Sequence, residues 1–316
     1  MRALVTGGAG FIGSTLVDRL LAEGHAVDVV DDLSSGSLAN LSDARSSPDH
    51  DYSFHRLDIR SPDLIELMAH RRPEVVFHLA AQADVRVSVT RPAFDAEVNI
   101  LGTISVLEGA RAGVSRKVVF AASGGTLYGE TKEIPTRESA PQHPQSPYGV
   151  SKKSAIDYLF AYRDLYGIEY TALALANIYG PRQDPHGEAG VVAIFSGLLL
   201  SGQPCTIFGD GEQTRDFVYV DDVVDAFSRA ATRGEGLLVN IGTGIETSVN
   251  QLYSTMASLA SSTVPPKYAP ARPGELRRSA LDPSRAAVQL GWSPWTSVEE
   301  GCSQVLRWFD RRSASG

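Results

Sequence analysis

The chain has 316 residues, enough for one large domain or two closely joined domains with a full hydrophobic core. Its net charge of −8, without a block of like charges, argues against nucleic-acid binding. No apolar run approaches the roughly 18–20 residues of a membrane span, and the chain enters a strand at once. We therefore expect no membrane association, no signal peptide and a cytoplasmic location. Cys205 and Cys302 lack metal-ligand spacing, so we expect reduced thiols and no metal site.

The first predicted element is a strand over Arg2–Thr6, followed by a glycine-rich turn and a helix over about 12–23. Glycines at this spacing allow a tight turn and the close backbone approach that a pyrophosphate requires. The helix N-terminus then directs free amides at that phosphate. An ordinary strand-to-helix turn could contain the same glycines. The residues that follow therefore have to distinguish such a turn from a dinucleotide-binding turn. The residues of this predicted dinucleotide site are Gly7, Gly10, Phe11, Ile12 and Gly13.

The second predicted strand, Ala26–Asp31, ends in a carboxylate. Asp31 lies at the sequence distance at which an acidic side chain binds the ribose 2′-hydroxyl of a dinucleotide. The same charge would repel a 2′-phosphate. The neighbouring Asp32 could partly replace Asp31 in this role. The two elements together predict that the chain binds NAD in preference to NADP.

Strand-like and helix-like segments alternate to about residue 180. This alternation predicts an α/β fold with a doubly wound, Rossmann-type parallel sheet and a ligand at the carboxyl ends of its strands. Beyond Pro181 the pattern becomes irregular, and we expect a smaller substrate-binding lobe over 181–316, closely joined to the NAD-binding part over 1–180, with some segments able to return to that part. Further strands are predicted at 53–58, 75–79, 117–122, 169–176, 205–208 and 237–241, and further helices at about 62–71, 92–112, 148–166, 191–201, 221–232, 248–261 and 297–311.

Tyr148 and Lys152 are four residues apart on a predicted helix, so their side chains share one face. A tyrosine has an ordinary pKa near 10, and half-ionisation at pH 7 requires about 4 kcal/mol. A cation ~4 Å away supplies about that much at an effective dielectric near 20. Lys152 is therefore sufficient to make Tyr148 a general base. The alternative is an ordinary pair on a helix surface.

These features together resemble the extended short-chain dehydrogenase/reductase family, and within its nucleotide-sugar branch the short bacterial UDP-glucose 4-epimerases. The likeness runs from residue 1 to about 312. Its signals are mutually spaced, which makes it more specific than any single motif. It rests on Gly7/Gly10/Gly13, Asp31, Asp58-Ile59, the segment 78–82 (His-Leu-Ala-Ala-Gln), Tyr148/Lys152, the segment 177–182 (Asn-Ile-Tyr-Gly-Pro-Arg), the segment 208–218 and the segment 271–275 (Ala-Arg-Pro-Gly-Glu).

The resemblance implies that NAD stays bound while sugar C4 is transiently oxidised, which interconverts UDP-glucose and UDP-galactose. Tyr148 would take the proton of the 4-hydroxyl, and His78 is expected to be a packed strand residue. The implied cofactor residues, besides those above and Tyr148 and Lys152, are Asp58, Ile59, Ala80, Ala81, Gln82 and Asn99. The implied substrate residues are Asn177, Arg215 and Arg272 at the diphosphate, Val192 to Phe195 near the uracil, Ser279 beside the sugar, and Glu275. Asp84, Arg86 and Ser88 follow the fourth predicted strand, where they could face the nicotinamide or the sugar, with loop capping as the alternative for Asp84.

One position departs from the family pattern. Many relatives carry an orienting Ser or Thr four residues before the tyrosine of the Tyr-Gly step, where this chain has Gly124. Ser123 and Thr126 flank the gap, and we expect one of them to be the catalytic hydroxyl. A strand-end hydroxyl bonded to backbone is the alternative for either. Related 4,6-dehydratases place Asp-Glu in this stretch, and the absence of any carboxylate between 123 and 129 favours epimerisation.

Several alternatives remain open at this point. The sequence does not decide between UDP and dTDP, or between glucose, glucuronate and N-acetylglucosamine as the hexose. The small Ser279 at the position that faces the C2 substituent in related enzymes predicts acceptance of N-acetyl sugars. A non-catalytic NAD-binding sensor or scaffold is the alternative of another class. Apolar stripes on the helices near 92–112 and 148–166 predict a homodimer, as in the resembling enzymes.

Overall fold

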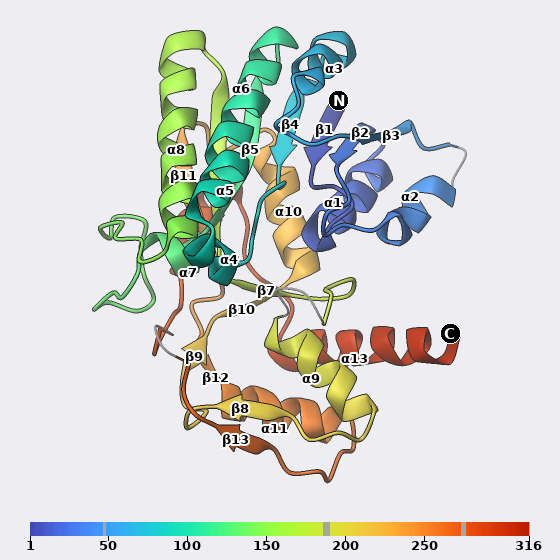
Figure 1. Ribbon diagram of the computed structural model, residues 1–316, viewed down its shortest axis with the longest axis vertical. Coiled ribbons are helices and arrows are strands. Elements are labelled where there is room, and N and C mark those ends of the chain that lie inside the picture. The colour runs from blue at the N-terminus through green and yellow to red at the C-terminus, as the bar shows by residue number, and fades with distance from the viewer. Residues whose placement is uncertain (47–48, 186–189, 273–275, 316) are drawn as a thin grey trace.

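A seven-stranded parallel sheet forms the centre of the molecule, in the order β11-β6-β5-β4-β1-β2-β3 (Figure 1). The computed structural model describes residues 1–46, 49–185, 190–272 and 276–315. The order extends from β1 in both directions, which is the doubly wound arrangement predicted from the sequence. The strands are β1 Arg2–Thr6, β2 Ala26–Asp31, β3 Tyr52–Arg56, β4 Val75–His78, β5 Lys117–Ser123, β6 Glu169–Leu175 and β11 Leu237–Ile241.

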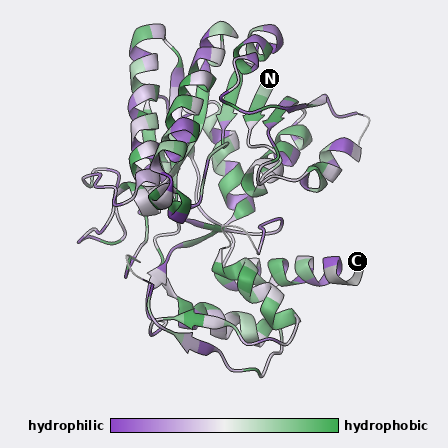
Figure 2. Ribbon diagram, in the orientation of Figure 1, coloured by the Kyte–Doolittle hydropathy of each residue, from purple (hydrophilic) through white to green (hydrophobic). Residues whose placement is uncertain are grey.

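Two apolar clusters lie on the opposite faces of this sheet. Leu4 of β1 belongs to one cluster, and its neighbours Ala3 and Val5 belong to the other, because successive strand residues point to opposite faces. Both faces are therefore covered by helices, which is why the strands are almost uniformly apolar. Figure 2 shows hydrophobic residues along the sheet and mixed hydropathy on the outer helices.

The helices of the first part follow the predicted alternation. They are α1 Phe11–Ala22, α2 Ser42–Ser46, α3 Asp63–Arg71, α4 Val85–Thr90, α5 Pro92–Ala96, α6 Gly102–Ala112, α7 Gly124–Leu127 and α8 Pro147–Tyr166, with a 3₁₀ turn η1 at Leu38–Leu41. The predicted helix over 92–112 is divided: a π-helical turn, η2 Glu97–Leu101, separates α5 from α6. Such wide turns inside helices occur frequently at functional sites, and this one contains Asn99.

The second part of the chain is divided between the sheet and a separate lobe. Strand β11 adds to the sheet beside β6, and α10 Val220–Ala230 packs against α1, so these segments return to the first part. The remainder forms the lower lobe in Figure 1. Helix α12, Ser284–Leu290, packs near β11. Strands β7, Asn177–Tyr179, and β10, Phe217–Tyr219, pair with each other and lie between the two parts. The elements of the lower lobe are α9 Val191–Leu200, β8 Thr206–Phe208, β9 Thr214–Arg215, β12 Thr247–Ser248, α11 Val249–Leu259, β13 Lys267–Ala269 and α13 Val298–Ser315.

Within the described ranges, none of the helices combines the length and the apolar character that crossing a bilayer would require.

Candidate active site

The turn after β1 is built around two glycines that nothing larger could replace. Gly7 has a φ of +70°, and a Cβ there would lie 2.7 Å from the amide nitrogen of Ala80. A Cβ on Gly13 would lie 2.1 Å from the carbonyl oxygen of Gly7. Gly10 begins α1 without a side-chain cap, so the first amides of the helix, around Phe11 and Ile12, have no capping partner. This geometry fits the pyrophosphate of a dinucleotide.

Asp31 connects the end of β2 to that turn. Its carboxylate is 8% exposed and accepts hydrogen bonds from the amides of Ala9, at 2.9 Å, and Leu33, at 2.8 Å. Burial raises the pKa of the Asp31 carboxyl, and the two amide bonds oppose that rise. Each oxygen keeps a further lone pair for a ribose hydroxyl. Asp32 instead accepts a hydrogen bond from the amide of Ser34 at 2.8 Å.

Asp58 and Ile59 lie just beyond β3, at the same edge of the sheet. Strand β3 ends at Arg56, two residues earlier than predicted. The Asp58 carboxylate is bound by the guanidinium of Arg60, which lowers its pKa. The Ile59 side chain is buried and packs against Gly102 at the start of α6.

The segment after β4 is fixed against the π-helical turn η2. The amide of Gln82 donates to Oδ1 of Asn99, and Nδ2 of Asn99 donates to the Gln82 carbonyl, both at 2.9 Å. The amide of Ala80 donates to Oγ1 of Thr6 at 3.2 Å. These bonds hold the loop between β1 and η2, and Ala80 lies directly against Gly7 of the glycine turn.

His78 is fully enclosed at the end of β4. Its Nδ1 lies 2.7 Å from Oγ1 of Thr6, and its Nε2 lies 3.0 Å from Oγ1 of Thr103. Burial, together with the charge of Lys152, lowers the pKa of His78 to about 3. The imidazole is therefore neutral at physiological pH and has both nitrogens engaged, which fits the packed strand residue expected from the sequence.

Helix α8 presents Tyr148 and Lys152 at the carboxyl end of β5. Ser146 caps the helix by accepting a hydrogen bond from the amide of Gly149. The Lys152 ammonium is 3% exposed, donates to the Ala121 carbonyl at 3.0 Å and lies 5.7 Å from the centre of the Tyr148 ring. Burial lowers the pKa of Lys152 to about 8, and the charge of Asp95 opposes that shift. The structure therefore places the Tyr148 ring next to the Lys152 ammonium, as the i, i+4 spacing predicted.

The two candidate hydroxyls differ in what they bind. Thr126 donates its hydroxyl back to the Ser123 carbonyl at 3.4 Å. Ser123 ends β5 and is half-buried, and its hydroxyl has no hydrogen-bond partner among the described residues. At position 124 the side chain of Leu281 fills the available space, because a Cβ there would lie 2.4 Å from its Cδ1. This geometry favours Ser123 and explains why the chain has glycine at position 124.

Asp84 and Ser88, which were predicted to face the nicotinamide or the sugar, form hydrogen bonds within their own helix, α4. Asp84 caps α4 by accepting hydrogen bonds from the amides of Arg86 and Val87, and it also binds the Arg86 guanidinium. Arg86 lowers the pKa of Asp84. Ser88 is buried and donates its hydroxyl to the Val85 carbonyl at 2.6 Å, so its prediction as a substrate residue is not supported. Arg86 remains well exposed.

The predicted diphosphate residues come from the second lobe and its junction with the first. The guanidinium of Arg215 donates to the carbonyls of Thr214, at 2.7 Å, and Leu276, at 2.9 Å. Arg272 is exposed and stacks 4.0 Å from the centre of the Phe208 ring. Asn177 begins β7 and is exposed. The predicted substrate residue Glu275 lies outside the described residues.

Two further predictions for the substrate lobe concern α9 and the chain before Leu281. Val192 and Phe195 are each 1% exposed, so their side chains belong to the core; the backbone of this segment and the half-buried Ile194 remain for a base. Phe195 packs edge-on against Tyr253. Ser279 is half-buried and follows Arg278, which is held by an ion pair with Glu246.

Two buried carboxylates near the site, Asp95 and Asp216, were not predicted from the sequence. Asp95 is fully buried and accepts hydrogen bonds from Gln82, Asn99 and Ser151. Its position four residues before Asn99, on one helical face, is the signal that could have identified it. Asp216 accepts hydrogen bonds from the amides of Thr243, Gly244 and Leu281 and so fixes the leucine that covers Gly124.

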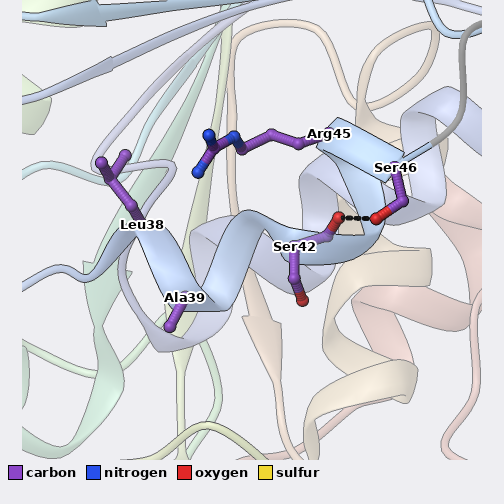
Figure 3. A pocket seen from close by; sticks show the side chains of 5 residues that line it. All are labelled: Leu38, Ala39, Ser42, Arg45 and Ser46. Atoms are coloured by element: carbon purple, nitrogen blue, oxygen red, sulfur yellow. Dashed lines mark hydrogen bonds between the residues drawn. The ribbon is translucent and has the colours of Figure 1, made fainter.

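A cavity of about 380 Å³ lies away from Tyr148, on the short segment that follows β2 (Figure 3). Its lining consists of Leu38, Ala39, Ser42, Arg45 and Ser46, and the Ser46 hydroxyl donates to the Ser42 carbonyl. None of the predicted site residues lines it, so we do not assign it to a substrate. Across the ranges that the structure describes, His, Cys, Asp and Glu side chains form no group of three or more that could hold a metal ion.

Comparisons with known proteins show the family to which the chain belongs. Residues 4–305 match the family described as GDP-mannose 4,6 dehydratase. The chain is 51% identical over 314 residues to a UDP-glucose 4-epimerase of Mycolicibacterium smegmatis, covering 99% of this chain and 100% of that protein. A Thermotoga maritima UDP-glucose 4-epimerase, solved with UDP-glucose, superposes with a TM-score of 0.95 at 45% identity, covering 99% and 100% of the two chains. A Thermus thermophilus UDP-glucose 4-epimerase, solved with NAD, has a TM-score of 0.90 at 41% identity, covering 98% and 99%.

The contrast between the two glycines of α7 gives a direct test of the packing around Ser123. We expect Gly124→Ser to lower the free energy of unfolding by roughly 1–3 kcal/mol, because its side chain would overlap Leu281. Gly125→Ser is the matched control, since a Cβ there meets nothing within 4 Å, and we expect a change of less than about 0.5 kcal/mol. Chemical denaturation of both variants measures the difference. Equal stability of the two would contradict the assigned packing.

Proposed function

We propose that this chain, which belongs to the UDP-glucose 4-epimerases of the extended short-chain dehydrogenase/reductase family, interconverts UDP-glucose and UDP-galactose with NAD as its cofactor. The observation that carries the proposal is the Tyr148 phenol beside the buried Lys152 ammonium, in a chain 51% identical to such an epimerase over nearly its whole length. The pair lies at the sheet edge that also holds the glycine turn and Asp31.

The residues around the glycine turn fit NAD. The uncapped start of α1 would hold the pyrophosphate, Asp31 the adenosine ribose, and the loop at Ala80–Gln82 with Asn99 the nicotinamide side. When bound, NAD supplies a reversible two-electron acceptor for sugar C4. A neutral His78 behind this loop adds no charge that would oppose the cationic ring.

Tyr148 acts as the general base toward the sugar 4-hydroxyl and later returns the proton to the same oxygen. The cationic Lys152 lowers the free energy of the phenolate, and a lysine pKa of about 8 leaves most molecules charged at pH 7. The Ser123 hydroxyl, which has no hydrogen-bond partner among the described residues, positions the 4-oxygen of the sugar. Arg215 and Arg272 hold the diphosphate while the hexose turns to present its other face.

Dehydration, the chemistry of related nucleotide-sugar enzymes, needs an additional acid and base near C5 and C6. The turn of helix that would supply them here consists of Gly124–Leu127, which contains no carboxylate. The bordering Ser123 offers a hydroxyl only. This set of groups suffices for transient oxidation at C4 and favours epimerisation.

We further propose that the protein acts in galactose metabolism in the cytoplasm. The reaction product, UDP-galactose, supports the first assignment. Cys205 and Cys302 are both free and buried, which supports a reducing compartment.

We propose a homodimer that uses α8 and the neighbouring end of η2. Val150, Tyr158 and Leu165 on α8 and Leu101 at the end of η2 are between 39% and 70% exposed, and α6 and α8 lie side by side (Figure 1). Exposed apolar side chains gathered on adjacent helices mark an interaction surface. Light scattering of the wild type should give a mass twice the 33.9 kDa of one chain. The double variant Val150→Asp/Leu165→Asp should give the mass of a single chain. A monomeric wild type would contradict the dimer.

The base assignment is tested by single substitutions at the site. We expect Tyr148→Phe to lower kcat by a factor of roughly 10²–10⁴ while NAD remains bound, because the proton acceptor is lost.

Ser123→Ala should lower kcat strongly. Its control, Thr126→Ala, should change kcat little, since the Thr126 hydroxyl is bonded to backbone. Turnover of UDP- and dTDP-sugars followed by NMR gives both the rates and the preferred hexose. A wild type that binds NAD but forms no reduced nicotinamide with any sugar nucleotide would instead support a non-catalytic sensor.

We also propose that Ser279 leaves room for an N-acetyl group at sugar C2. The side chain is half-buried, and the ion pair of Arg278 with Glu246 holds the segment in place. The wild type should therefore epimerise UDP-N-acetylglucosamine as well as UDP-glucose, and Ser279→Tyr should remove only the first activity. Ser258→Tyr, an exposed serine on α11, is the control and should retain both. Failure of the wild type to convert the N-acetyl sugar would refute an open pocket.

A further inference from the structure

A buried carboxylate joins the cofactor loop to the catalytic helix. Asp95 of α5 is fully buried, and its Oδ1 accepts hydrogen bonds from Nδ2 of Asn99, at 2.9 Å, and Nε2 of Gln82, at 3.0 Å. Its Oδ2 accepts the hydroxyl of Ser151 at 2.6 Å. Ser151 directly precedes Lys152 on α8. One side chain therefore joins the helical run that carries Asp95 and Asn99 to the loop at Gln82 and to α8.

The second observation concerns the charge around Lys152. Its ammonium is 3% exposed and contacts two uncharged groups, the Ala121 carbonyl and the Phe120 ring. The neighbouring titratable groups are Tyr148 on its own helix, the neutral His78 on β4 and Asp95 on α5. Among the described residues, Asp95 is the anion whose field favours the protonated lysine. A buried amine without such a partner loses its proton readily.

We propose that Asp95 is a positioning residue for the epimerisation, one that supplies the negative charge keeping Lys152 protonated and fixes Gln82 and Asn99 against α8. The inference rests on the proposed function, in which Lys152 must be a cation to stabilise the Tyr148 phenolate. The Asp95 carboxylate accepts hydrogen bonds from Gln82, Asn99 and Ser151, and it acts through these neighbours.

The test is a direct titration of Lys152 by NMR of protein carrying ¹³Cε-labelled lysine, in the presence of bound NAD. The chain has five lysines, and a Lys152→Arg sample identifies the relevant signal. We expect Asp95→Asn to lower the pKa of Lys152 by about one unit or more, since the amide keeps the shape but loses the charge. Ser151→Ala is the matched control, because it removes a hydrogen bond to Asp95 and leaves the charge, so Lys152 should titrate as in the wild type.

The pH profile of turnover gives a second readout. Removing a negative charge makes the protons of both Tyr148 and Lys152 easier to lose, so both limbs of the profile should move to lower pH in Asp95→Asn. A merely structural role would lower activity equally at every pH. Asp95→Ala should show the same movement and also retain less NAD, because it frees Gln82 and Asn99.

An unchanged Lys152 titration in Asp95→Asn would overturn the proposal. If that variant does not fold, Asp95→Ser, which keeps a hydroxyl without the charge, serves the same titration and has the same two outcomes. A wild type that turns over no sugar nucleotide would refute the proposed function, whereas the titration would still decide the role of Asp95.

Discussion

The organisation of the site depends on the burial of one ammonium group under the carboxyl edge of the sheet. A 3% exposed lysine is unfavourable unless polar groups and a counter-charge surround it, and here the Ala121 carbonyl, the Phe120 ring and Asp95 provide them. These groups come from β5 and α5, while the lysine comes from α8. The packing of α8 on the sheet and the charge state of its base are therefore set by the same contacts.

Parts of this site could be predicted because they depend on short stretches of sequence. The glycine spacing after β1, the carboxylate that ends β2 and the i, i+4 pair of Tyr148 and Lys152 each express a local requirement of backbone or helix geometry. The carboxyl ends of parallel strands lie along one edge, so these separate signals also predicted their meeting place. The doubly wound parallel sheet and most element boundaries followed from the same alternation of apolar segments.

The features that could not be predicted depend on contacts between distant segments. Gly124 reflects the position of Leu281, which is in turn fixed by Asp216. The sequence places Ser88 where it could face the nicotinamide or the sugar, whereas in the structure its side chain is buried and its hydroxyl donates to the Val85 carbonyl. The π turn at Asn99, and the identity of β11 as a segment that returns to the sheet, likewise depend on tertiary packing, which overrides the local pattern.

The two halves of the site have different chemical tasks, and they come from different parts of the fold. The proposed proton-transfer groups lie on β5 and α8, whereas Arg215 and Arg272, the proposed diphosphate residues, lie in the second lobe and are held there by carbonyls and by the Phe208 ring. A substrate anchored by its diphosphate to one part leaves the hexose attached through rotatable bonds only. Epimerisation requires that freedom, because the same base and cofactor must meet both faces of C4. A site whose second lobe also bound the hexose firmly would hold the sugar more tightly but would oppose its rotation.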